Sequence, residues 1–148
     1  MSIPMLVHLS LMGLMVLLCI CAAVVARKRA GNWLPRHRLV GILGACLGLI
    51  GLAVMVFEKI EHGYAHFKSP HAMGGLLVGI LLVLVPLLGF LGTKGLNKLR
   101  MPHRILARIL VVIAPIVLIT GIFRYLQISE PSSVSDAAPV PPAPPAQP

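Results

Sequence analysis

The sequence predicts an all-α integral membrane protein, a bundle of four transmembrane helices that run up, down, up and down. Two observations predict this fold class. Of the 148 residues, 57% are hydrophobic and only 11% are charged, and the mean hydropathy of +0.93 is not that of an ordinary soluble domain. Four stretches also reach the roughly 20 apolar residues needed to cross the hydrocarbon core of a bilayer, namely residues 4–26, 37–57, 71–92 and 103–125. We therefore expect one membrane domain over residues 1–127.

The first stretch is expected to be a retained helix and not a signal peptide. No basic residue precedes its long apolar run, and Arg27, Lys28 and Arg29 follow it directly. The connections between stretches are short, so sequential helices should be antiparallel neighbours, with the first and third helices diagonal to each other, like the second and fourth. Residues 128–148 are rich in proline and alanine, which predicts a disordered external tail.

The net charge of +9 is concentrated in two of the expected connections and in the first turns of the helices that follow them. Ten of the 13 basic residues lie there: Arg27, Lys28, Arg29, Arg36, Arg38, Lys94, Lys98, Arg100, Arg104 and Arg108. The positive-inside rule then places both connections in the cytoplasm and both termini outside it. Basic residues in such places set topology and contact anionic membrane lipid. The charge therefore predicts a multi-pass protein of a plasma or inner membrane, and no nucleic-acid partner.

One histidine stands near the start of each apolar stretch: His8, His37, His71 and His103. A polar, ionisable side chain inside a membrane bundle is a functional-site hypothesis by default. Because alternate helices start on opposite sides of the membrane, His8 can meet only His71, and His37 can meet only His103. Two imidazoles are a normal axial pair for haem iron, whereas two imidazoles without thiolate or carboxylate make a poor zinc site. The pattern predicts two bis-histidine sites, each for a non-covalent haem b, and it assigns no catalytic residue.

Glycines follow two of these histidines at helical spacing. His37 is followed by Gly41, Gly44, Gly48 and Gly51, and His71 by Gly75. Such stripes serve either close helix packing or the approach of a flat cofactor. Because the stripes start at a histidine in two helices, we expect a cofactor slot.

The connection after the second stretch contains a further group of polar residues. His62 and His66 lie there with Glu58, Glu61 and Tyr64. They could exchange protons with a quinol or hold a metal ion, or they could be an ordinary solvated loop. Three cysteines lie mid-span without a C-x-x-C spacing, so they are expected to act as small apolar side chains: Cys19, Cys21 and Cys46.

Several short motifs, taken together and in order, resemble the core of the cytochrome b561 family, including the versions attached to DOMON domains and those similar to ferric-chelate reductases. The motifs cover residues 5–125, and each is short. They are His8-Leu-Ser-Leu-Met12, His37 with Gly41, Gly44 and Gly51, His66-Phe67 before His71-Ala-Met-Gly74, Pro86-Leu-Leu-Gly89, and His103-Arg104 with Arg108 and Thr120-Gly121. Two positions depart from the pattern: Val85 stands where glutamine is frequent, and Ala107 where glycine is.

The resemblance implies two b haems, one near each membrane face, with electrons crossing between them. Carried over by position, His8 and His71 would hold the outer haem iron, and His37 and His103 the cytoplasmic one. The expected function is electron transfer across the membrane from a donor to an acceptor. The donor could be a quinone in its quinol form, an ascorbate-like reductant or a redox protein, and the acceptor could be a metal ion such as ferric iron. The competing hypothesis is a haem-free structural subunit that anchors a larger complex. Homo-oligomer formation is left open by the sequence.

Overall fold

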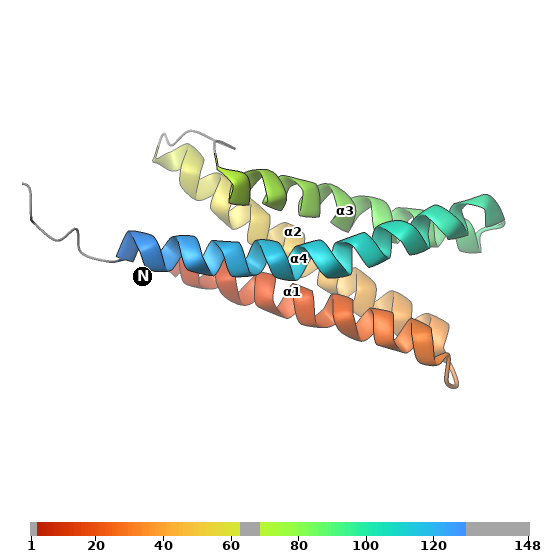
Figure 1. Ribbon diagram of the computed structural model, residues 1–148. Coiled ribbons are helices and arrows are strands. Elements are labelled where there is room, and N and C mark those ends of the chain that lie inside the picture. Colours follow the sequence, from red (N-terminus) through yellow and green to blue (C-terminus); the bar gives the residue numbers. More distant parts are fainter. Residues whose placement is uncertain (1–2, 63–68, 130–148) are drawn as a thin grey trace, which may run out of the picture.

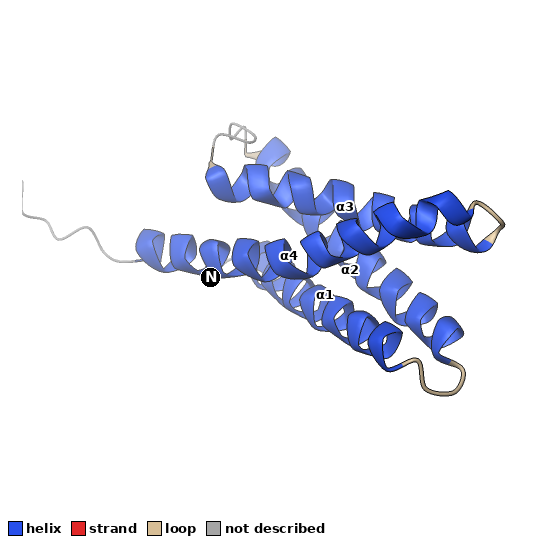
Figure 2. Cartoon of the chain, turned by 45° about the vertical axis from the view of Figure 1, so that its right-hand side comes forward, coloured by secondary structure: helices blue, strands red, loops and turns tan. Residues whose placement is uncertain are grey.

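The computed structural model describes residues 3–62 and 69–129 of the chain, and these form four long helices. They are α1 (Ile3–Lys28), α2 (Trp33–Glu61), α3 (Pro70–Thr93) and α4 (Arg100–Ser129), with a short 3₁₀ helix η1 (Asn97–Leu99) before α4 (Figure 1). Within the described ranges there is no strand, and loops only join helix ends (Figure 2). Each of the four is long and apolar enough to cross a membrane. The expected four-helix membrane bundle is confirmed.

The helices extend beyond the apolar stretches that predicted them. Helix α2 begins at Trp33, not at residue 37, and α4 begins at Arg100 and ends at Ser129, past the expected domain end at residue 127. Hydropathy marks only the part of a helix that lies in hydrocarbon, whereas the backbone hydrogen bonds of a helix continue into the interfacial layer. The expected tail beyond Ser129 lies outside the described residues.

Local sequence explains how the connections are made. Ser69 caps α3 by accepting a hydrogen bond from the backbone N–H of Ala72 (3.2 Å), and Pro70 occupies the first turn, where its missing N–H costs nothing. The α1–α2 connection turns through two left-handed residues, Arg29 (φ 47°) and Gly31 (φ 53°). The start of α3 and the turn before α2 are therefore both explained by residues that lie next to them in the sequence.

The four helices form two antiparallel hairpins, α1 with α2 and α3 with α4, which cross each other (Figures 1 and 2). Contacts between the hairpins run from α2 to α3 and from α1 to α4. No Cα atom of α1 comes within 8 Å of α3, and none of α2 comes within 8 Å of α4. The first and third helices are therefore diagonal, as expected, and so are the second and fourth.

The core of the bundle lies at mid-height between the hairpins. Met15, Val78 and Leu82 are its most deeply buried side chains, each less than 2% exposed. A Cβ placed on Gly48 would lie 2.6 Å from Leu82 Cδ1 and 2.8 Å from Met15 Cγ. Three helices thus meet at Gly48, and a side chain at this position would separate them.

The glycine stripe of α2 packs against α1. A Cβ on Gly44 would lie 3.1 Å from Leu18 Cβ, and one on Gly51 would lie 3.2 Å from Leu11 Cβ. Gly44, Gly48 and Gly51 are all buried. These three glycines are small residues that let two helix backbones approach closely, which is the packing use of such a stripe; the cofactor slot stays a prediction.

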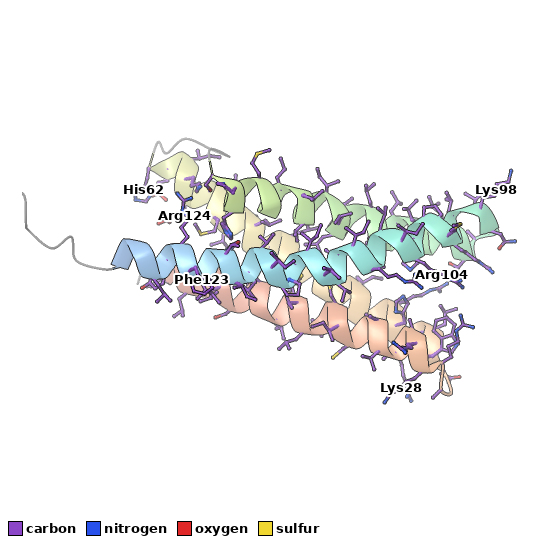
Figure 3. The ribbon with its side chains drawn as sticks, viewed as in Figure 1. Lys28, His62, Lys98, Arg104, Phe123 and Arg124 are labelled. Carbon is purple, nitrogen blue, oxygen red and sulfur yellow. The ribbon has the colours of Figure 1, made fainter. Side chains whose placement is uncertain are left out.

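Most of the lysine and arginine side chains of the described residues lie at one end of the bundle. Lys28, Lys98 and Arg104 lie at the end that carries the α1–α2 and α3–α4 connections, whereas His62 and Arg124 lie at the opposite end (Figure 3). Between these ends, large apolar side chains such as Leu17 and Val112 are 60% exposed. Such an outward apolar surface suits contact with membrane lipid.

Candidate functional site

In the first hairpin, two histidines donate hydrogen bonds across the helix pair. His8 of α1 lies with its Nδ1 2.8 Å from the carbonyl oxygen of Gly51 in α2. His37 of α2 lies with its Nδ1 3.0 Å from the carbonyl oxygen of Ala22 in α1. Both imidazoles are half-buried. The two bonds are reciprocal, since each helix provides one histidine and one carbonyl.

The second hairpin repeats this arrangement. His71 of α3 lies with its Nδ1 3.1 Å from the carbonyl oxygen of Val117 in α4, and His103 of α4 with its Nδ1 2.9 Å from the carbonyl oxygen of Val85 in α3. The Thr120 hydroxyl donates to the Val117 carbonyl as well (2.8 Å). Both rings are again half-buried.

All four bonds follow one spacing rule. In each helix the accepting carbonyl comes fourteen positions after that helix's own histidine: Ala22 after His8, Gly51 after His37, Val85 after His71 and Val117 after His103. Fourteen residues at about 1.5 Å per residue span about 21 Å. The histidines therefore form two layers separated by about 21 Å along the bundle, one toward each end.

The hydrogen bonds determine which ring nitrogen is available. A carbonyl oxygen can only accept, so each Nδ1 must carry a proton, and in the neutral ring the Nε2 then keeps its lone pair. No described residue is bonded to any of these Nε2 atoms, and within the described ranges no buried side-chain nitrogen or oxygen lacks a partner. The four Nε2 atoms therefore face accessible space. An imidazole whose second nitrogen donates to a carbonyl is the usual state of a histidine that ligates a metal.

Each layer brings together one histidine from each hairpin. The ring centres of His37 and His103 are 6.2 Å apart, and their planes are inclined by 81°. At the other end, His8 is hydrogen-bonded to the carbonyl of Gly51 and His71 to that of Val117. These two carbonyls lie at the same number of residues from the His37–His103 pair, so the two rings are at one level of the bundle. These are the two diagonal pairs that helix direction predicted, and the structure places each pair in one layer.

Two glycines of the second hairpin lie directly against histidine rings. A Cβ on Gly89 would lie 2.9 Å from His103 Cε1, and one on Gly121 would lie 2.6 Å from His71 Cε1. Each glycine follows an accepting carbonyl by one helical turn, since Gly89 follows Val85 and Gly121 follows Val117. Sequence analysis did not find this role, although a histidine followed by a glycine eighteen positions later in both α3 and α4 is a detectable signal.

An aromatic side chain also borders the His37–His103 layer. The ring centre of Trp33 lies 6.3 Å from that of His37, and the Arg29 guanidinium lies 5.8 Å above the Trp33 ring. The Arg29 contact is a cation–π pair at the membrane interface, and it ties the α1–α2 connection to the first turn of α2.

The polar group at the C-terminal end of α2 lies apart from both layers. The ligand atoms of Glu58, Glu61 and His62 lie within 4.8 Å of one another, and Glu61 and His62 are exposed. The Glu58 carbonyl accepts a hydrogen bond from His62 Nδ1 (2.9 Å). This bond raises the pKa of His62, and the Glu58 and Glu61 carboxylates add to the effect. His66 and Tyr64, which the sequence associated with this group, lie outside the described residues.

Comparison of the chain with protein families, with characterised proteins and with solved structures found no match.

Proposed function

We propose that this protein is a dihaem cytochrome b, similar to the cytochrome b561 core, that carries electrons across a membrane. The observation that carries the proposal is the set of four histidines described above. All four present a free Nε2, all four are oriented by the same kind of hydrogen bond, and they are arranged as one pair in each of two layers.

The His37–His103 separation supports bis-imidazole ligation. A metal ion held through the Nε2 atoms of two imidazoles, at about 2.0–2.1 Å from each nitrogen, requires the two rings to be close neighbours. The ring centres of His37 and His103 are 6.2 Å apart. In the described part of the chain neither pair belongs to a group of three metal-ligating side chains. Two protein ligands suit haem, which supplies four nitrogens of its own, better than zinc, which takes three or four from the protein.

The side chains of the protein would contribute orientation and insulation. Backbone carbonyls fix the tautomer and the angle of each ring before any ligand arrives, which lowers the cost of ordering it on binding. Between the layers, Met15, Val78 and Leu82 form a packed apolar centre, so water is excluded there. A haem held between two imidazoles supplies one-electron transfer and has no open coordination position. His8 and His71 would hold one haem, and His37 and His103 the other.

The haem content of the purified protein tests this proposal. We expect two haems per chain after expression in haem-replete cells, measured by pyridine haemochrome against protein mass, with a low-spin six-coordinate spectrum. A haem content near zero in a monodisperse, helical preparation would overturn the proposal and leave the haem-free anchor subunit. If the protein does hold two haems, its electron donor and acceptor can be identified by supplying quinol, ascorbate or a ferric chelate to the haem-loaded protein.

A further inference from the structure

A hollow of about 260 Å³ lies at the turn between α1 and α2. Three apolar residues line it, together with two cations: Val24, Val25, Ala30, Lys28 and Arg36. We call this site the turn hollow. Pockets that enclose a drug-sized ligand have volumes of about 300–1,000 Å³, so the turn hollow can hold only part of a larger molecule.

The backbone of the turn has a defined shape. Arg29 and Gly31 are both left-handed, the Arg29 N–H donates to the Val25 carbonyl (3.2 Å), and the Trp33 N–H donates to the Gly31 carbonyl (2.8 Å). The Arg29 guanidinium stacks on Trp33. The turn is therefore held in place from both sides, and the hollow beside it is part of the fold.

The two cations of the turn hollow have no partner among the described residues. No ion pair or hydrogen bond joins Lys28 or Arg36 to a described side chain, and the only acidic residues in those ranges, Glu58 and Glu61, lie at the opposite end of α2. Three further basic residues flank the hollow in sequence, namely Arg27, Arg29 and Arg38. An anion is the complementary occupant.

The place of the turn hollow selects the kind of anion. It lies where two membrane-spanning helices end and begin, which is the level of the lipid headgroups. Its lining is apolar on the α1 side, where Val24 is 43% exposed. A free phosphate would gain nothing from these valines, whereas a phospholipid would place its phosphate between the cations and its first methylenes against them. Basic pockets beside transmembrane helices bind anionic headgroups in this way.

We infer that the turn hollow is a binding site for one anionic phospholipid, whose phosphate lies between Lys28 and Arg36. None of the four helix histidines lines this site, so the absence of a bound lipid would not contradict the proposed function, and the absence of haem would not contradict the lipid site.

Native mass spectrometry of the full chain, released from micelles that contain phosphatidylglycerol and phosphatidylcholine, tests this site. The wild type should retain one phosphatidylglycerol in preference to phosphatidylcholine. The double variant Lys28→Gln/Arg36→Gln should bind it about 30-fold more weakly, given the contribution of each cation near a lipid surface. The matched control Lys98→Gln/Arg104→Gln removes the same charge from the same end of the bundle. It should stay within about threefold of the wild type, because neither Lys98 nor Arg104 lines the turn hollow.

A second variant keeps every charge and blocks the space. Ala30→Trp should fill the turn hollow and also abolish the retained phosphatidylglycerol, so the inference can be tested even if the double variant fails to fold. Equal losses in the double variant and its control would show a general charge effect and overturn the site. Retention in Ala30→Trp, equal retention of phosphatidylcholine, or displacement of the lipid by excess inorganic phosphate would overturn it as well.

Discussion

The imidazole and the carbonyl that holds it are the smallest unit of the candidate site. In each of the four cases a backbone oxygen of the neighbouring helix accepts from Nδ1, and this contact decides which nitrogen can bind a metal. Because the acceptor is a backbone carbonyl, no particular side chain is needed to orient the ring, and almost any residue type can occupy the accepting position. Gly51, Ala22, Val117 and Val85 share only their place in the helix pair.

Gly89 and Gly121 give a prediction at this scale. Gly89→Ala should displace the His103 ring, and Gly121→Ala the His71 ring, because the added Cβ would lie 2.9 Å and 2.6 Å from the respective Cε1 atoms. Neither ring can move away without losing its hydrogen bond to α3 or α4. Loss of such an orienting bond costs roughly 10–100-fold in metal affinity. Haem titration of the apoprotein should show this loss at one site in each variant.

Gly13→Ala is the matched control for these two variants. A Cβ on Gly13 would meet nothing within 4 Å, so the substitution should leave both sites unchanged. If Gly89→Ala and Gly121→Ala bind two haems as tightly as Gly13→Ala does, the contacts of these glycines have no part in the sites.

His62 gives a prediction for pH dependence. The hydrogen bond to the Glu58 carbonyl and the nearby carboxylates raise the pKa of His62 above its ordinary 6.5. The protonated ring therefore stabilises the end of α2 below the ordinary pKa, and this contribution is lost as the pH rises through the raised value. The pKa can be measured by NMR. Glu58→Gln/Glu61→Gln should lower it only in part, because the carbonyl remains; a wild-type pKa at or below 6.5 would contradict the prediction.

At the scale of helices, each hairpin contains two histidine-to-carbonyl hydrogen bonds with the same spacing. A histidine near the start of one helix reaches the carbonyl fourteen positions after the histidine of its partner. The rule connects α1 with α2 and α3 with α4, whereas the pairs that could share a ligand join α1 with α3 and α2 with α4. Each histidine thus bonds to its neighbouring helix and faces the diagonal one.

This difference between neighbour and diagonal helix can be tested by paired substitutions. His8→Ala and His71→Ala should each remove the same haem, and His37→Ala and His103→Ala should each remove the other. Reduced-minus-oxidised spectra of the four variants would show two classes. If His8→Ala and His37→Ala removed the same spectral component, the ligand pairs would follow the hairpins, and the diagonal assignment would be wrong.

At the scale of the whole molecule, the two layers and the charge define the ends of the bundle. The layer with His37 and His103 lies at the end that carries Lys28, Lys98 and Arg104 (Figure 3). By the positive-inside rule this end should face the cytoplasm. The layer with His8 and His71 should then lie toward the outer face.

Cysteine labelling tests this orientation. In a background without Cys19, Cys21 and Cys46, an impermeant maleimide should reach His62→Cys in intact cells, and it should reach Asn32→Cys and Lys98→Cys only after lysis. Labelling of Asn32→Cys in intact cells would show that the orientation is the opposite of the predicted one. Labelling of Asn32→Cys and His62→Cys from the same side would contradict a membrane crossing by α2.

The sequence by itself determined the number of helices, their alternation and the histidine pairs that can meet. These properties depend on hydropathy and on the direction of each helix, which are local or follow from simple counting. The sequence did not determine the carbonyl partners, since a backbone oxygen is present at every position, or the use of Gly44, Gly48 and Gly51, since packing and cofactor contact require the same small residue. Only the tertiary structure decided these points, because they depend on which helix faces which and at what depth.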